Sequence, residues 1–507
     1  MSTSSGDSVF PEQKPRLTGV KAALQYTGIP PSWLDKRPKL PSRNWLIFIG
    51  VTSTLTGYYL YDRQQCKRIR QEYVDKVKHF AEIPLHSMDY PRKVTVYGTK
   101  WPGDEDSDRS MLFFRKYVKP VLVAAAVDYE MIKGKRHGDL ARRIAEDIKK
   151  RRRIELGLEP PPVMPVVLPN TSAEDKRRRE LEGGVVIVGR LTFKEFMAGL
   201  KRGWTEGLQT VDREEELAKE FELDGRFDEP EPDVDPIQSS PDLDGEPIPT
   251  PSRLPPSKSF SAFTPPHLRG SSSSALPTSG SSIPAGMDTP PTAIPPQPPI
   301  LFVHFVNHIG LTHIPLMIWE FFNERRKVRE GAEAAYRLIM GHVRPFVSPP
   351  SEGASESFDA DPTTSPPRPH MSEPSISDLD FGKDAEVWYK KSTVRSFRSD
   401  IEKARSGYYA SLPAKLETAR ALARRTRELT KEEVNYPPPT EVELRSERMK
   451  KELRWRADEE GWDIVSPDSP VAWDQRFADA LRVFTDPVAE LQAIGEDQRD
   501  GDSKSAQ

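Results

Sequence analysis

Gly189 and Arg190 stand where a phosphate-binding site is most plausible in this chain. Gly189 ends the apolar run of residues 183–189, and Arg190 precedes a segment with a helical pattern. In α/β proteins, the turn between a buried strand and a helix often binds phosphate through backbone N–H groups. The glycine fingerprint G-x-G-x-x-G and the Walker A lysine are both absent. The pair is therefore a weak candidate for a nucleotide site.

An acidic group resembles the start of a calcium loop. Asp104, Asp106 and Asp108 alternate with other residues, as the first ligands of an EF-hand do. That loop also needs glycine at its sixth position and glutamate at its twelfth, where this chain has Arg109 and Arg115. We therefore expect the acidic residues to cap the following helix and not to bind a metal.

Three histidines, His304, His308 and His313, lie close together in the sequence. Residues four apart in a strand are about 13 Å from each other, which is too far to share one metal ion. A helix would bring the first two together, but the alternation of Phe and Val around them favours a strand. We expect these histidines to be structural.

Runs of basic residues could contact anionic phospholipid head groups, where each cation gains about 1 kcal/mol. The alternative is a solvated helix end, and the pattern leaves both open. The motifs G-x-S-x-G and H-E-x-x-H do not occur. We expect no catalytic, cofactor-binding or metal site, so the sequence favours binding and scaffolding over catalysis. The basic runs are Lys149–Arg153 and Lys176–Arg179, with Lys133, Lys135 and Arg136.

Composition narrows the class of protein further. The chain has 507 residues, of which 36% are hydrophobic and 30% charged, with 50 prolines and a net charge of -3. The near-zero net charge argues against a general nucleic-acid binder. The single cysteine, Cys66, excludes an intramolecular disulfide and a cysteine-based zinc site.

The elements that would position these residues alternate between strand and helix patterns. Apolar runs without polar interruption are typical of strands that are covered on both faces. Thr192-x-x-Glu195 predicts a capping box at the start of one helix. Such alternation implies an α/β fold with a mainly parallel sheet. The predicted strands are 94–97, 121–127, 183–189 and 301–306, and the predicted helices are 107–117, 140–154, 193–204 and 315–340.

Proline- and serine-rich segments divide this pattern, because they have too few aliphatic residues to form a core. After them, charged amphipathic helices are predicted at 385–411 and 413–430, and Thr440-x-x-Glu443 caps a last helix that ends near Glu460. The expected organisation is a disordered basic tail (1–43), a transmembrane helix (44–62), a juxtamembrane helix (63–90), an α/β domain in two parts (91–228 and 299–346) around a disordered insert (229–298), a second disordered insert (347–383), a C-terminal helical region (384–465) and a mostly disordered tail (466–507).

Residues 45–61 form the stretch that we expect to cross a bilayer. A helix of this length spans roughly 25 Å, slightly less than a typical hydrocarbon core. Four hydroxyl residues and two glycines lower its apolar content, but no charge occurs between Arg43 and Asp62. A buried helix of a soluble domain is the alternative.

Five segments together resemble a known family, the large single-span subunit of the fungal mitochondrial inner-membrane translocase that inserts carrier proteins. The resemblance covers the tail, the span, the α/β region and the C-terminal helices, and it skips both inserts. The segments are Pro41–Phe48, Tyr61–Arg63, Phe114–Pro120, Gly199–Trp204 and Asn435–Arg445.

The resemblance implies a non-enzymatic subunit that supports the channel-forming subunit, with no cofactor. It also implies docking of the small intermembrane-space chaperones that deliver carrier precursors. The N-terminus would lie in the matrix and the bulk of the chain in the intermembrane space. Charge counting alone favours the opposite orientation, since residues 24–43 hold four Lys or Arg and residues 62–80 hold six. The alternative function is a membrane-tethered α/β enzyme that acts on lipid or nucleotide near Arg190.

Overall fold

The computed structural model describes residues 42–85, 91–160, 173–209, 212–228, 288–348 and 377–486. Our expectations for the N-terminal tail, for most of both inserts and for residues 487–507 lie outside this part of the chain. The chain divides into two compact units, Met1–Gln65 and Cys66–Gln507. The sheet and the helices that cover it belong to the second unit.

One continuous helix, α3 (Arg43–Ala81), includes the stretch that we expected to cross a membrane. That expectation is wrong: within the described part of the chain, no helix combines the length and the apolar content that crossing a bilayer requires. The hydroxyl residues dilute the apolar stretch, and two of them donate hydrogen bonds within the helix. Thr52 donates to the Phe48 carbonyl at 2.8 Å, and Thr54 donates to the Gly50 carbonyl at 2.8 Å. The expected continuation of the helix past Asp62 is confirmed.

A six-stranded sheet forms the centre of the second unit, in the order β2-β1-β3-β4-β6-β5. In this order, the strands from β2 to β6 pair in parallel, and β5 at the end pairs antiparallel with β6. The mainly parallel α/β sheet predicted from the sequence is therefore confirmed. The strands are β1 (Lys93–Gly98), β2 (Asp128–Lys133), β3 (Val185–Val188), β4 (Ile300–Val303), β5 (Val343–Pro345) and β6 (Arg482–Phe484).

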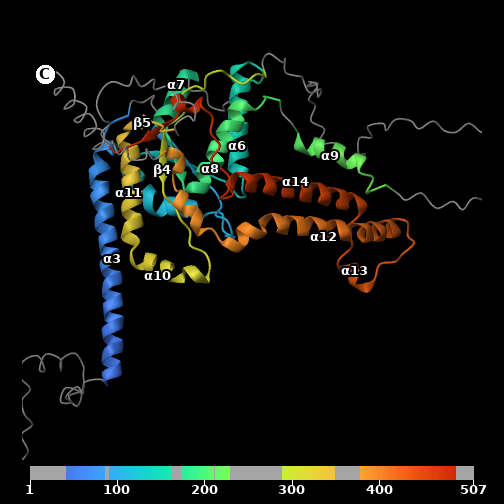
Figure 1. Cartoon of the computed structure of the whole chain (residues 1–507), viewed down its shortest axis with the longest axis horizontal. Helices are drawn as coiled ribbons and strands as arrows, with labels where there is room; N and C mark the ends of the chain where they lie inside the picture. Colours follow the sequence, from blue (N-terminus) through green and yellow to red (C-terminus); the bar gives the residue numbers. More distant parts are fainter. Residues whose placement is uncertain are drawn as a thin grey trace, which may run out of the picture. The chain divides into compact units, whose positions relative to one another are not determined.

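Helices cover both faces of this sheet, as Figure 1 shows for α11 on one side of β4 and α8 on the other. Alternate residues of β3 explain the two cores: Val186 and Val188 belong to one hydrophobic cluster, and Val185 and Ile187 belong to the other. The first cluster includes residues of η1 (Phe114–Val118), α5 (Lys119–Ala124) and α11 (Glu324–Met340), and the second includes residues of α6 (Asp139–Glu155) and α8 (Arg190–Thr205).

The predicted strand at 121–127 is wrong, because residues 119–124 form helix α5. Pro120 lies in its first turn, a position that proline tolerates. Val121 and Leu122 are fully buried while Val123 is 55% exposed, a pattern that a strand covered on both faces does not give. Strand β2 was missed because it lies at the edge of the sheet, where Asp128, Glu130 and Lys133 are exposed and interrupt the apolar pattern.

Two predicted helix boundaries differ from the structure. The helix expected over 315–340 is interrupted at Asn323, which separates α10 (Ile314–Phe322) from α11. The break expected at Leu412-Pro413 is absent, since α12 (Lys391–Ala423) continues through the proline. The remaining predicted helices correspond to α4 (Arg109–Phe113) with η1, α6, α8 and α14 (Glu441–Val465).

The C-terminal part of the chain is more ordered than we expected. Thr440 and Glu443 form the predicted capping box of α14. Beyond α14, within the expected tail, lie the short helix α15 (Phe477–Ala480) and strand β6. Val483 and Phe484 of β6 are buried in the two cores. A three-residue strand leaves too short a pattern to be read from sequence.

Helix α14 approaches the α/β core through two glycines. A Cβ atom at Gly461 would lie 1.9 Å from the His137 carbonyl oxygen, and one at Gly138 would lie 2.6 Å from the Gly461 Cα. The His137 ring packs against Phe397 and Trp462. Burial lowers the pKa of His137 to about 4, so this ring is neutral at physiological pH. Only glycine at positions 138 and 461 lets the two backbones approach this closely.

The change Gly461→Ala should lower the free energy of unfolding by roughly 2–3 kcal/mol, because the added methyl group collides with a backbone carbonyl. Gly407→Ala is the matched control, since α12 leaves open space around Gly407. That change should instead be neutral or stabilise by up to about 1 kcal/mol. Urea titration of the full chain measures both. Equal effects of the two changes would contradict the close contact.

Candidate functional site

Arg190 does lie at the carboxyl end of β3, but its guanidinium is occupied by the protein itself. Its Nε donates to Glu386 at 2.9 Å, and its Nη1 donates to the carbonyl oxygens of Phe381 at 3.1 Å and of Leu379. Lys194 binds the same Glu386 carboxylate at 2.7 Å and the Ser466 carbonyl at 2.8 Å. Both cations are almost fully buried.

The segment 377–388 therefore covers the position where a phosphate would bind. It consists mainly of two short turns, η4 (Asp378–Asp380) and η5 (Lys383–Trp388). Gly189 lies against Phe305, whose Cβ is 3.3 Å from the position of an added Cβ. The arrangement binds two parts of the chain together, and it gives no support to the nucleotide site that we considered.

The predicted capping box at Thr192 and Glu195 is wrong. Helix α8 starts one turn earlier, with Gly189 as its N-cap residue. The Thr192 hydroxyl donates to the Val188 carbonyl at 2.6 Å. Glu195 is fully buried and accepts a hydrogen bond from the Leu140 N–H at 3.1 Å, at the start of α6. The carboxyl group therefore caps a neighbouring helix and not its own.

Burial raises the pKa of Glu195 to about 8, although three backbone N–H groups oppose the shift. The loss of hydration disfavours the charged form more than these hydrogen bonds favour it. Glu195 is thus largely neutral in the folded protein near pH 7. A perturbed carboxyl can mark an active site, but this one contacts the backbone of α6 inside the core.

The acidic group does not cap its helix through a side chain. Asp108 is the N-cap residue of α4 but makes no capping hydrogen bond, and it pairs with Lys133 at 2.8 Å. Asp104 accepts hydrogen bonds from the Asp106 N–H at 3.1 Å and from Asn307 at 2.7 Å. These residues close a turn and connect it to the chain after β4.

The three histidines do not converge on one site, although His308 and His313 share an aromatic neighbour. His304 pairs with Asp384 at 3.2 Å, and His308 pairs with Glu320 at 3.2 Å. His308 and His313 both pack edge-on against Trp388. Among the described residues, no group of three or more His, Cys, Asp or Glu side chains could hold a metal ion.

Most of the basic run on α6 is neutralised by the protein. Arg152 is buried and donates to the Gly203 carbonyl at 2.8 Å. The neighbouring cations pair with carboxylates: Lys149 with Glu206, Lys150 and Arg153 with Glu159, and Arg151 with Glu180. The second run pairs similarly at Arg177 with Glu155 and at Arg178 with Glu182. These contacts favour a structural role for the runs over lipid contact.

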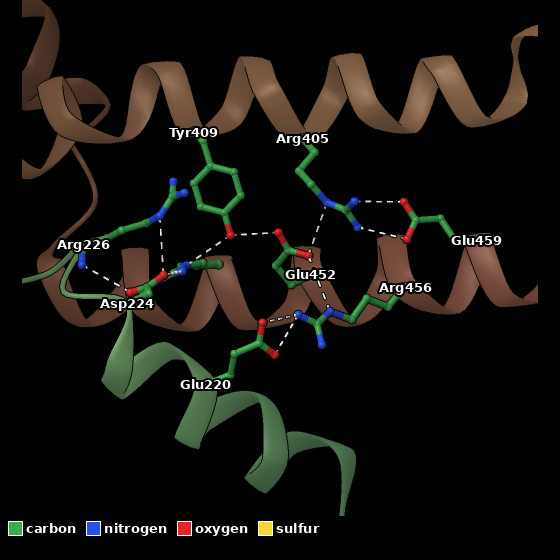
Figure 2. A network of polar contacts seen from close by, with 9 residues as sticks. Glu220, Asp224, Arg226, Arg405, Tyr409, Glu452, Arg456 and Glu459 are labelled. Atoms are coloured by element: carbon green, nitrogen blue, oxygen red, sulfur yellow. Dashed lines mark hydrogen bonds and ion pairs between the residues drawn. The ribbon is translucent and has the colours of Figure 1, made fainter.

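Sequence reasoning missed a network of charged residues between α9 (Arg213–Leu223), α12 and α14, which we call the helical arm. Figure 2 shows its two centres. In the first, Arg448 is 3% exposed, binds Asp224 through both terminal nitrogens and lies 3.8 Å over the Phe221 ring. Its Nε donates to the Tyr409 hydroxyl at 3.3 Å.

The second centre is Glu452, which is also buried. The Tyr409 hydroxyl donates to it at 2.8 Å, and Arg405 lies 3.4 Å away (Figure 2). Arg456 connects this centre to Glu220 of α9 at 2.8 Å. Buried charges are costly unless each is paired, so these contacts fix how the three helices pack. Because α9 ends more than 160 residues before α12 begins, local sequence patterns do not indicate this pairing.

One end of the arm exposes apolar side chains. We call this end the arm tip, and it consists of residues 429–442, including α13 (Lys431–Asn435). Tyr436 is 85% exposed and Val442 76% exposed. Leu429 and Val434 are exposed beside them in the sequence. Exposed apolar groups that cluster on a surface are typical of protein interaction sites, and the tip has four of them within one short stretch of the sequence.

The pKa of Glu195 predicts a pH dependence of stability. The folded pKa of about 8 lies above the ordinary value of 4.5. The contribution of this group to the stability of the fold is therefore fully present below pH 4.5 and is lost as pH rises through about 8. Glu195→Gln keeps this position neutral. Relative to the original chain, it should therefore gain roughly 4 kcal/mol between pH 5 and pH 8.5.

Urea titrations of both chains across this pH range measure the gain. Glu182→Gln is the control, because the Glu182 side chain is exposed and lies 3.8 Å from Arg178 on the surface of α7 (Ala173–Gly183). A pH-independent difference between Glu195→Gln and the original chain would contradict a neutral Glu195.

Comparison with known proteins identifies the chain's relatives. The sequence model of the family described as "Inner membrane protein import complex subunit Tim54" matches residues 21–406. The mitochondrial import inner membrane translocase subunit TIM54 of Cryptococcus neoformans is 38% identical over 93% of this chain and 95% of its own length. The Candida albicans subunit is 28% identical over 66% of this chain and 87% of its own. The resemblance found in the sequence is confirmed: this chain belongs to the Tim54 family of inner membrane protein import complex subunits.

Proposed function

We propose that this chain is a non-enzymatic scaffold of the mitochondrial inner-membrane translocase that inserts multi-span carrier proteins. In this role it supports the channel-forming subunit and docks the small intermembrane-space chaperones that carry the precursors. Family membership supports the translocase assignment. The observation that supports scaffolding is the arm tip, which exposes apolar side chains on helices joined by buried ion pairs.

The alternative, an enzyme acting on lipid or nucleotide, has no comparable support. Its phosphate site would need Arg190 or Lys194 to be available, and both bind Glu386. Releasing either cation would leave a buried charge without its partner, which typically costs 3–5 kcal/mol, as an order of magnitude. We therefore assign these residues to holding the fold together.

The arm tip is the part of the chain that we assign to binding the channel-forming subunit. Tyr436 is a suitable anchor, because large aromatic side chains supply much of the binding energy at interfaces. Val442 and Val434 add apolar area next to it. Glu433 and Glu441 of the tip pair with nearby arginines, which leaves the apolar side chains as the part of the tip that is available to a partner.

The double change Tyr436→Ser with Val442→Ser should reduce recovery of the channel-forming subunit by about ten-fold or more, since anchors of this kind contribute upward of about 1–2 kcal/mol each. The measurement is co-isolation from mitochondria that contain the tagged full-length chain. Val123→Ser with Val387→Ser is the matched control, because both residues are similarly exposed and lie outside the tip. Equal recovery with both variants, at equal thermal stability, would reject the tip as the binding site.

We also propose that the Cys66–Gln507 unit faces the intermembrane space, where the chaperones would reach it. An epitope at the C-terminus should then be digested by protease once the outer membrane is ruptured, while a matrix marker survives. Survival of the epitope in mitochondria with an intact inner membrane would reject this placement.

A further inference from the structure

Helix α10 is an apolar helix on the surface of the second unit. Its nine residues, Ile-Pro-Leu-Met-Ile-Trp-Glu-Phe-Phe, include one charge, and none of them is buried. Leu311, in the turn before the helix, is 85% exposed, and Trp319 within it is 59% exposed. Exposing this much apolar surface is costly in water, so a contact is expected to cover it. The exposed apolar residues are Leu311, Ile314, Leu316, Met317, Ile318, Trp319 and Phe321.

The one charge of α10 fastens the helix to the rest of the unit. Glu320 binds His308 at 3.2 Å and Lys327 at 2.8 Å. At the end of the helix, Asn323 donates to the Trp319 carbonyl at 2.9 Å. A cavity of about 230 Å³ lies beside these residues and is too small to accept a helix or a strand of another protein. Leu316 and Trp319 line this cavity and are still partly exposed, while the polar contacts hold the helix in place.

The distribution of apolar side chains decides which partner fits. Leu316, Met317, Ile318 and Trp319 are consecutive, so at about 100° per residue they surround most of the helix. A flat protein surface would cover only one side of such a helix. The head-group and acyl boundary of a bilayer is fluid, so it can adapt to exposed apolar side chains that point in several directions.

Charge supplies the second argument. Helix α11 begins directly after α10 with Glu-Arg-Arg-Lys and continues with Val-Arg. Arg326 and Arg329 are exposed, and Arg326 lines the cavity beside Trp319. Tryptophan prefers the membrane interface, and exposed cations next to apolar side chains are attracted to anionic lipid.

We propose that α10 inserts its apolar side chains into the head-group region of a bilayer that contains anionic phospholipid, with Arg326 at the phosphates. This proposal deepens the proposed function by adding a lipid contact to the scaffold. It rests on the proposed function because a subunit of a membrane translocase works at a membrane surface. It assigns a lipid-binding surface to residues 311–322 that the basic runs on α6 and α7 (Ala173–Gly183) do not provide.

A fluorescent probe at one residue tests this in the full-length chain. Met317→Cys gives an exposed thiol on α10, and the chain's other cysteine, Cys66, is buried. After labelling with bimane, the protein is mixed with vesicles of phosphatidylcholine and phosphatidylglycerol that carry brominated acyl chains. The emission should shift to shorter wavelength and be quenched. Leu223→Cys, labelled in the same way on α9, is the control, and its emission should not change.

Adding Arg326→Gln should raise the lipid concentration needed for half-maximal quenching at position 317 by roughly five-fold, which corresponds to one cation at an anionic surface. In vesicles of phosphatidylcholine alone the same change should have little effect. An unquenched probe at 317 in vesicles that have captured the protein would overturn the proposal. So would a probe that shifts only when a carrier precursor is added, because α10 would then bind polypeptide.

Co-isolation of the channel-forming subunit separates this proposal from the proposed function. The change Met317→Gln with Trp319→Gln should remove the lipid contact and leave subunit recovery intact. If the original chain recovers no other subunit while its probe at 317 is quenched, the scaffold function fails and the lipid contact stands.

Discussion

The second unit depends on a single carboxylate, Glu386, which is shared by two buried cations of α8. Arg190 and Lys194 are 5% and 1% exposed, so each would be strongly destabilising without a partner. Burial lowers the pKa of Lys194, and the contact with Glu386 opposes that shift. The same cations bind backbone carbonyls at Phe381 and Ser466. One polar cluster thereby joins the sheet, the segment before α12 and the end of α14.

This cluster explains why the carboxyl end of the sheet, which commonly binds ligands in α/β proteins, is closed here. The chain uses the favourable position at Gly189 and Arg190 to attach its own C-terminal half. The interaction surfaces then lie elsewhere, at the arm tip and at α10, and both are apolar. They differ in shape: the tip presents Tyr436 beside a few aliphatic residues, whereas α10 is apolar around most of its circumference. That difference underlies the assignment of one to a protein and of the other to lipid.

Sequence reasoning succeeded where the residues that determine an element all lie within one short segment. Strand β3 has both faces buried, so its apolar run was readable, and the capping box at Thr440 and Glu443 is entirely local. The same spacing at Thr192 and Glu195 misled us, because Glu195 finds its partner on α6, 55 residues away. The partner of Arg190 lies 196 residues away. The arm network joins residues on either side of the first insert, and no local hydrophobic periodicity indicates such pairs.

The position of β6 sets an order of events for the chain. This strand lies between β4 and β5, yet it is contributed by residues 482–484, after every other strand. A chain that emerges N-terminus first therefore holds β4 and β5 with open edges until almost five hundred residues have passed, and unpaired strand edges invite wrong partners. The sheet is therefore complete only once residues 482–484 have joined it, and a chain cut before residue 482 lacks the strand that pairs with both β4 and β5.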